Sequence, residues 1–243
     1  MTETVRFDRR FQGFEHGALG GYAAGVVAAR IDGPAEANLR SLPQMERDLE
    51  IRKLGEGLEL WDGETLVLEA LPASFDLAIP ETPSLAKAKE AASRLIHDET
   101  GHLYPSCFTC GPDRDEGDGL RLFMGRLDPE GELLASAWTP DPALGAEDGA
   151  LPAEMVWAAL DCPTIWAGWA RSYPAEAGEG FTVLARQRLD ITAPVPTGEP
   201  VIVTAWPIEQ DGRKHLCGAA IADADGRPLA RAESLLIAVP ARR

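Results

Sequence analysis

AEMVWAALDCPTIWAGWA, residues Ala153–Ala170, is an apolar run of helical length with one carboxylate, Asp161, near its middle. Removing a lone carboxylate from water costs several kcal/mol unless a partner compensates for it. Such a group is retained for a structural or a chemical reason, and groups of this kind cluster at functional sites. The run therefore predicts a central helix of the fold and marks Asp161 as its most informative position.

Two interpretations of Asp161 stay open on the residues alone. In Asp161-Cys162-Pro163 the aspartate is a good helix N-cap and the proline suits an early helical turn, so a new helical segment would start there. Pro163 inside a continuous helix would instead free a backbone group and cause a kink. Alternatively, burial would raise the basicity of Asp161, which would then activate a water molecule or attack a substrate directly.

Short apolar runs separated by turn sequences flank this helix, a pattern typical of antiparallel strands. In the second half we expect strands at Leu120–Leu127, Glu132–Trp138, Phe181–Thr192, Pro200–Glu209, Lys214–Asp223 and Leu229–Val239. In the first half we expect a strand at Val5–Gln12, a glycine-opened helix at His16–Ile31, and strands at Ala35–Leu42, Met45–Leu54, Leu58–Trp61 and Thr65–Leu71. The Asp-Gly pairs at 62–63, 211–212 and 225–226 predict hairpin turns.

The same plan, one central helix followed by a meander of strands, occurs twice. A connecting helix at Pro83–His97 and a loop rich in Asp, Gly and Pro at Asp98–Gly119 separate the copies, so the predicted domains are 1–98 and 99–243. A curved sheet around one helix has an open edge that a second copy can pair with, which favours an α+β pseudo-dimer. The alternatives are two unrelated α+β domains or one irregular sheet.

Composition narrows the function classes. The chain has 243 residues, of which 45% are hydrophobic, enough for a substantial core without disulfides. Its formal net charge of −16 argues against a nucleic-acid partner, which requires a surface that neutralises phosphates. The start of the sequence, MTETVRFDRRF, has no apolar run after its charges, and no stretch is long enough for a membrane span. We therefore expect a cytoplasmic protein without membrane partners.

Three segments resemble the hotdog-fold thioesterase superfamily, in particular double-hotdog proteins of the acyl-CoA thioesterase type. They are GGYAAG at Gly20–Gly25, CFTCGPDRDEGDGLRLF at Cys107–Phe123 and PAEMVWAALDCPTIWA at Pro152–Ala167. The resemblance implies a tandem (double) hotdog fold, with two central helices each wrapped by an antiparallel sheet. One departure is that the second helix is preceded by Leu151-Pro152 and begins with Ala153, where thioesterases of the phenylacetate-pathway type have His-Gly-Gly.

Hydrolysis of a thioester needs donors that polarise the carbonyl and a base or nucleophile that delivers oxygen. The glycine-rich helix start offers backbone N–H groups at Gly20, Gly21 and Tyr22 together with the positive end of the helix dipole. The resemblance implies that this start faces Asp161 from the opposite repeat. Thr164, three residues after Asp161, is expected to hold the attacking water, and His16 to orient substrate or act as an alternative base. Trp157, with Trp166 and Trp169, is a candidate for the wall of an acyl pocket, although core packing is the role expected of at least two of them.

The Cys107–Cys110 pair has the C-x-x-C spacing of half a zinc site. A complete site would need two more ligands, and the candidates are His97, His102, Cys162 and Cys217, none with a second diagnostic spacing. We therefore predict reduced thiols packed in the linker loop, no metal and no cofactor, with zinc as the alternative.

The predicted function is hydrolysis of acyl-CoA or another acyl thioester, with Asp161 as base or nucleophile. The sequence has no G-x-S-x-G, H-E-x-x-H, Walker A or G-x-G-x-x-G motif that would support another enzyme class. The phosphates of CoA would require basic residues at the mouth of the pocket, with Arg186, Arg188, Arg213 and Lys214 as candidates. The alternative is a non-catalytic acyl or acyl-CoA binding protein. Further pairing into a homodimer of the pseudo-dimer is also expected.

Overall fold

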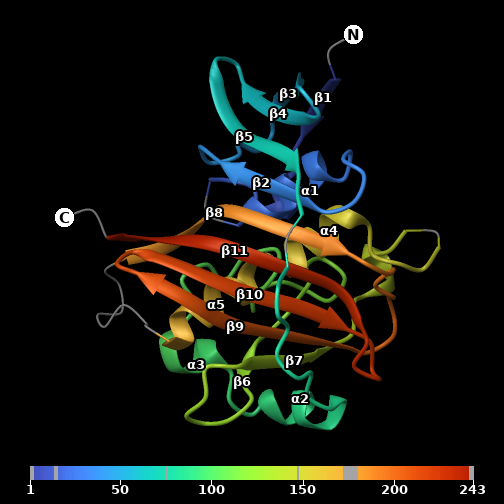
Figure 1. Ribbon diagram of the computed structural model, residues 1–243, viewed down its shortest axis with the longest axis vertical. Coiled ribbons are helices and arrows are strands. Elements are labelled where there is room, and N and C mark those ends of the chain that lie inside the picture. The colour runs from blue at the N-terminus through green and yellow to red at the C-terminus, as the bar shows by residue number, and fades with distance from the viewer. Residues whose placement is uncertain (1–2, 14–15, 75, 147, 172–179, 241–243) are drawn as a thin grey trace.

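The computed structural model describes residues 3–13, 16–74, 76–146, 148–171 and 180–240 (Figure 1). Its strands are β1 Glu3–Arg6, β2 Ala35–Leu39, β3 Asp48–Leu54, β4 Gly57–Asp62, β5 Thr65–Pro72, β6 Gly125–Arg126, β7 Leu134–Trp138, β8 Gly180–Ile191, β9 Val201–Asp211, β10 Lys214–Ala222 and β11 Pro228–Pro240. Its α-helices are α1 Gly20–Ala28, α2 Leu85–Ala91, α3 Ile96–Thr100, α4 Ala153–Ala159 and α5 Asp161–Arg171. Short 3₁₀ turns lie at Arg9–Phe11 and Pro142–Leu144.

All the strands in the described ranges belong to one sheet of 11 strands, in the order β1-β3-β4-β5-β2-β8-β11-β10-β9-β7-β6. The first five come from the first half of the chain and the last six from the second half. The halves join where β2 pairs antiparallel with β8, with Ala35 opposite Leu189 and Asn38 opposite Arg186. Pairing of two open sheet edges removes both from solvent.

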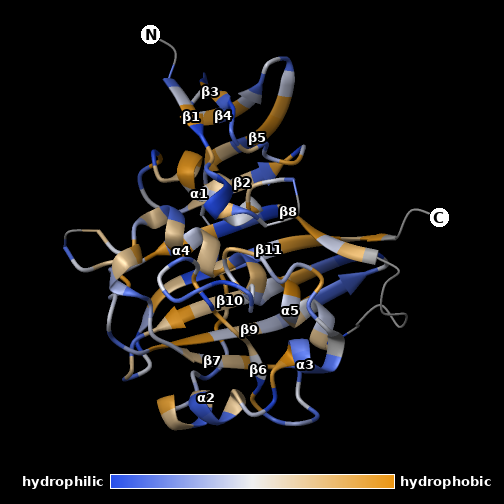
Figure 2. Cartoon of the chain, turned by 180° about the vertical axis from the view of Figure 1, so that it is seen from behind, coloured by the Kyte–Doolittle hydropathy of each residue, from blue (hydrophilic) through white to orange (hydrophobic). Residues whose placement is uncertain are grey.

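Helices α1, α4 and α5 pack on one face of this sheet, the face towards the viewer in Figure 2. Helix α1 lies against the first-half strands, and α5 lies against β8 to β11. Helix α4 packs on α1, so apolar residues of both halves form one continuous core. The large antiparallel sheet with a helix against each half confirms the predicted α+β class.

The Asp-Gly hairpins are confirmed. Gly63, Gly212 and Gly226 have φ of 60°, 55° and 85°, and each lies in a tight turn between two paired strands. Only glycine adopts this left-handed backbone without steric cost, which is why the pair reads so clearly in sequence.

Several predicted elements differ in the structure. The strand expected at Val5–Gln12 ends at Arg6, because Asp8 accepts a hydrogen bond from the N–H of Arg10 and starts the 3₁₀ turn at Arg9–Phe11. The helix expected at Pro83–His97 is two short helices, α2 with Ser84 as its N-cap and α3. The strand expected at Leu120–Leu127 is reduced to β6, because the N–H groups of Leu120 and Leu122 donate to the carbonyls of Phe108 and Thr109. These N–H groups therefore donate to a loop about a dozen residues earlier instead of to a neighbouring strand.

Residues 76–84 run across the outer face of the second-half strands towards α2 (Figure 1). Leu77 packs there against Trp206 of β9 and Ala220 of β10, and α2 buries Ala88 and Ala91 against the same side of the sheet. The boundary at residue 98 stays a prediction, although this segment of the first predicted domain packs on the strands of the second. Across the described ranges, no helix combines the length and the apolar character needed to cross a bilayer.

Candidate active site

The predicted central helix is interrupted where the sequence suggested. Helix α4 ends at Ala159, Leu160 has φ −96° and ψ 3°, and α5 begins at Asp161. Pro163 then lies in the first turn of α5, where its missing N–H costs no hydrogen bond. The break allows Asp161 to lie at the start of a helix and at the contact between the two halves.

Asp161 caps a helix, but not its own. Its Oδ2 accepts a hydrogen bond from the backbone N–H of Gly21 in the first turn of α1, with an N···O distance of 2.8 Å. Gly21 is required at this contact, because a Cβ there would lie 2.6 Å from the Cβ of Asp161 and 2.8 Å from the carbonyl oxygen of Trp157. Gly25, one turn later, allows the same close approach to Trp157. The two glycines explain why α1 and α4 can touch backbone to backbone.

The second carboxylate oxygen has a different environment. Asp161 is 2% exposed, and its Oδ1 is buried without a hydrogen-bond partner among the described residues. Burial raises the pKa of Asp161 to about 7, although the hydrogen bond from Gly21 opposes the rise. Near neutral pH this carboxyl group therefore exists in both protonation states, as a general base or acid requires.

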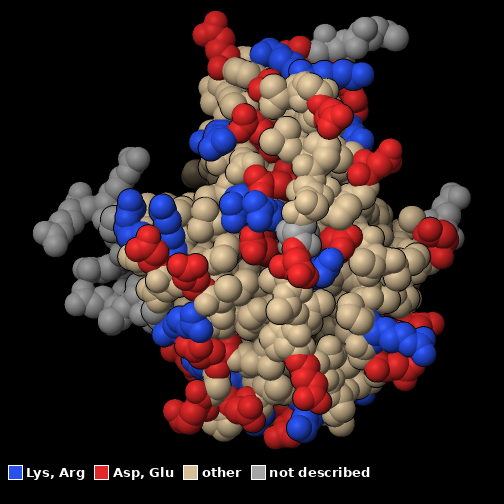
Figure 3. Space-filling view, in the orientation of Figure 1, with Lys and Arg blue, Asp and Glu red and all other residues tan. Residues whose placement is uncertain are grey.

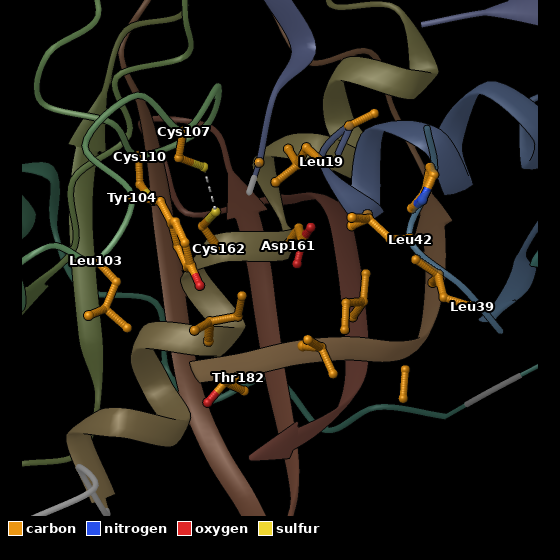
Figure 4. A pocket seen from close by; sticks show the side chains of 18 of the residues that line it. Leu19, Leu39, Leu42, Leu103, Tyr104, Cys107, Cys110, Asp161, Cys162 and Thr182 are labelled. Atoms are coloured by element: carbon orange, nitrogen blue, oxygen red, sulfur yellow. Dashed lines mark hydrogen bonds between the residues drawn. The ribbon is translucent and has the colours of Figure 1, made fainter. Parts of the chain in front are cut away.

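Asp161 lies in the wall of a cavity of about 280 Å³ between the two halves (Figure 4). The lining is mostly apolar, with Leu19 and Leu39 from the first half and Ile165 and Leu184 from the second. Leu42 and Leu103, 39% and 36% exposed, also line it and therefore mark its opening to solvent. A concave apolar site with a single buried carboxylate is the arrangement expected of a small-molecule site.

The predicted helix-start residues are only partly brought to this cavity. Gly20 lines it, and the N–H of Gly21, expected to face a thioester carbonyl, donates to Asp161 instead. Tyr22 points elsewhere, since its ring stacks on Phe11 at 3.9 Å between centroids. The first turn of α1 therefore faces Asp161 as expected, but one of its donors is already used.

The other predicted site residues lie outside the residues that line the cavity. The hydroxyl of Thr164 is fully buried and donates to the carbonyl oxygen of Asp161 at 2.7 Å. Trp157 is buried in the core, and its carbonyl oxygen accepts a hydrogen bond from Gln187. The side chain of His16 is exposed. Of the tryptophans considered, Trp166 and Trp169 contribute to the wall.

Several lining segments were not predicted from the sequence. These are residues 39–43 at the end of β2 and just after it, residues 103–104 before the C-x-x-C pair, and residues 182–185 of β8. The alternation of β8 marks its inward side, but nothing in the residues after β2 signals a pocket. Arg40 is the one Lys or Arg among the described lining residues, and it is paired with Glu69 at 2.6 Å.

The basic residues proposed for the phosphates of CoA lie away from the lining. Arg186 and Arg188 of β8 form ion pairs with Glu36 of β2 and Glu233 of β11. The face shown in Figure 3 carries acidic and basic side chains interspersed, without one broad basic patch among the residues described there.

Three of the four cysteines meet beside Asp161. The sulfur atoms of Cys107, Cys110 and Cys162 all lie within 4.8 Å of one another, and all three residues are buried. The structure thus brings Cys162 to the C-x-x-C pair, which the sequence could only name as one of several candidates.

No family model and no curated protein matches this sequence. Solved structures do. A conserved protein of unknown function with a hotdog fold from Alicyclobacillus acidocaldarius matches at TM-score 0.63 and 11% identity, covering 97% of this chain and 92% of that one. A protein from Thermobifida fusca, described as a candidate thioesterase II, matches at TM-score 0.61 and 15% identity over 97% and 91% of the two chains. A TesB protein of Mycobacterium avium subsp. paratuberculosis matches at TM-score 0.58 and 12% identity over 98% and 92%.

The chain therefore has the hotdog fold, and the resemblance in its sequence motifs is confirmed as a likeness of fold over nearly the whole chain. Fold alone does not assign chemistry, which must be argued from the site.

Proposed function

We propose that the protein is a double-hotdog pseudo-dimer that hydrolyses acyl thioesters, with acyl-CoA as the substrate class. One observation carries the proposal. Asp161 has one carboxylate oxygen fixed by Gly21 and the other without a partner among the described residues, in the wall of an apolar cavity. The solved structures of the same fold that are described as thioesterases support the reaction class by analogy.

In the proposed reaction, a water molecule lies between Oδ1 of Asp161 and the thioester carbonyl carbon. Asp161 takes a proton from this water, and the oxygen attacks the carbonyl to form a tetrahedral intermediate. When the carbon–sulfur bond breaks, the proton passes from Asp161 to the leaving thiolate, and the carboxylic acid product remains. The hydrogen bond from Gly21 holds the carboxylate in one orientation through both proton transfers.

The acyl chain would occupy the leucine-lined part of the cavity. Its volume of about 280 Å³ is at the lower end of typical ligand pockets, which favours short or medium acyl groups over long ones. Because Gly21 is occupied, the N–H at the first residue of α1, Gly20, is the donor that we assign to the carbonyl oxygen. The positive end of the helix dipole adds to its effect.

The test is thiol release from short, medium, long and aromatic acyl-CoAs. We expect turnover by the wild type, and a fall in kcat of about a hundred-fold or more with little change in KM for Asp161→Asn and Asp161→Ala, because proton transfer by a placed side chain contributes about this much. Asp190→Asn is the matched control. Asp190 is also a largely buried aspartate of the second half, but it pairs with Arg231 and does not line the cavity.

Wild-type turnover in both Asp161 variants would show that Asp161 is not the catalytic residue. Tight binding of an acyl-CoA by the wild type without release of thiol would instead identify a non-catalytic acyl-CoA binding protein.

A further inference from the structure

We propose that Cys107, Cys110 and Cys162 bind one metal ion of the zinc class, with the fourth coordination position open to the cavity. The sulfur atoms come from two places in the fold. Cys107 and Cys110 lie in the loop between α3 and β6, and Cys162 is the second residue of α5. This inference does not rest on the hydrolase proposal.

The distances fit a tetrahedral thiolate site. With zinc–sulfur bonds of about 2.3 Å, two sulfur ligands lie about 3.8 Å apart. The sulfur atoms of Cys107 and Cys162 are 3.6 Å apart, and those of all three cysteines lie within 4.8 Å (Figure 4). The residues are 4%, 5% and 4% exposed, so they are shielded from bulk solvent except through the cavity.

The loop is held in shape independently of the sulfur atoms. The N–H of Gly111 donates to the carbonyl of Cys107 at 2.8 Å, and a Cβ at Gly111 would lie 2.4 to 2.6 Å from backbone atoms of Pro105 and Cys107. Thr109, between the two loop cysteines, donates from its hydroxyl to the carbonyl of Ala158 in α4. The C-x-x-C-G loop is thus fixed against the helix pair that presents Cys162.

The thiolate is the form of cysteine that binds metal, and metal binding would release the thiol protons. Cys162 lies in the first turn of α5, where the helix dipole stabilises an anion.

The fourth position is left to a molecule in the cavity. All three cysteines line the cavity, and so does His102. However, Nδ1 of His102 accepts a hydrogen bond from the N–H of Tyr104, so the proton of the neutral ring is on Nε2, which has no hydrogen-bond partner among the described residues. His102 is also not one of the residues whose ligand atoms lie within 4.8 Å of one another. Three protein ligands with one exchangeable position are the pattern of reactive zinc sites, whereas structural sites are closed.

The test is a metal titration of the full chain, purified under reducing conditions and stripped with a chelator. Zn²⁺ is added in competition with a chromophoric chelator, and Co²⁺ is added in parallel to record thiolate-to-metal bands. We expect one equivalent of each ion. Changes around a ligand lower metal affinity about ten- to a hundred-fold, so loss of a ligand in Cys107→Ser or Cys162→Ser should lower it by about a hundred-fold or more.

Cys217→Ser is the matched control, because Cys217 is fully buried on β10 and outside the cluster. Its metal affinity should equal that of the wild type, and thermal unfolding without metal should show that each serine variant is folded. His102→Ala should also retain affinity, while a small thiol should shift the Co²⁺ bands by entering the open position.

Less than one equivalent of bound metal, or equal affinities for Cys162→Ser and Cys217→Ser, would overturn the site. A loss of affinity in His102→Ala, or Co²⁺ bands that do not respond to added thiol, would overturn the open fourth position.

Discussion

Helix α1 packs on the first-half strands and α5 on the second-half strands, but the two helices present different groups to each other and to the cavity. Helix α1 is uninterrupted, consists of glycine, alanine, valine and one tyrosine, and has no capping side chain of its own at its N-cap residue, Leu19. The second helix is broken at Leu160, and the break presents Asp161 and Cys162 at the cavity. The first helix contributes a backbone donor and two glycines that allow close approach, and the second contributes a buried carboxylate and a thiol to the cavity. In the proposed reaction, the two helices therefore have different roles.

The two halves of the sheet also differ, in the length of their strands. Strands β8 and β11 have 12 and 13 residues, whereas β2, the first-half strand at the junction, has five. The cavity lies at this junction, with Leu39 from one side and Leu184 from the other. The extra length of the second-half strands provides the surface on which α5 packs.

The largest expected effect comes from giving α1 a side chain where it now has none. In Gly21→Ala the added Cβ would contact Asp161 and the Trp157 carbonyl at under 3 Å, so the helices must separate. We expect a loss of about 1–3 kcal/mol in the free energy of unfolding, as for other overpacked cores. Because a misplacement of roughly 1 Å costs about a hundred-fold, kcat for a thioester should fall by about that factor. Chemical denaturation and thiol release measure the two effects.

Gly168→Ala in α5 is the matched control for this substitution. Its Cβ would meet Cys217 and His215 only at 3.5 and 3.6 Å, which is ordinary contact. Removing a glycine from a helix interior should then stabilise the protein by up to about 1 kcal/mol. If Gly21→Ala and Gly168→Ala changed stability and kcat equally, the close approach of α1 to α4 would not explain the need for glycine in α1.

A smaller effect is expected for Thr164→Val. The hydroxyl donates to the carbonyl of Asp161, so its loss should cost about 1 kcal/mol of stability, with kcat nearly unchanged. Urea unfolding and steady-state kinetics on the same preparation separate these outcomes. A large fall in kcat with normal stability would show that the threonine holds the attacking water, as the sequence suggested.

The smallest effect is expected at the junction of the sheets. Although burial opposes its ionisation, hydrogen bonds from Asn38 and Arg188 hold the pKa of Glu36 below its ordinary 4.5. Since the folded-state pKa is the lower one, this stabilisation is present above pH 4.5 and is lost as the pH falls further. Glu36→Gln should therefore cost up to about 1 kcal/mol at pH 7 and progressively less on acidification below 4.5. A difference in unfolding free energy that stayed constant with pH would contradict this explanation.

Features with local causes could be predicted from the sequence. The Asp-Gly turns, the alternation of β8 and the interruption near Pro163 each follow from a few neighbouring residues. The pairing of Asp161 with Gly21 needed the family resemblance as well, because no local rule connects the two. Two features depend on packing between distant segments: the contact of Cys162 with the C-x-x-C pair, and the leucine wall that follows β2. The spacing of residues along the chain does not predict such contacts.

The hydrogen bond between Gly21 and Asp161 joins residues 140 positions apart in the chain. During synthesis, α1 therefore emerges from the ribosome long before the carboxylate that caps it. Until then its small, apolar face has neither its helix partner nor the β8 edge that completes its sheet. Closing so long a loop delays native contacts, and exposed apolar surface favours aggregation in the interval. The cavity thus cannot be complete before β8 has been synthesised, and a product that ends before α5 lacks part of its wall.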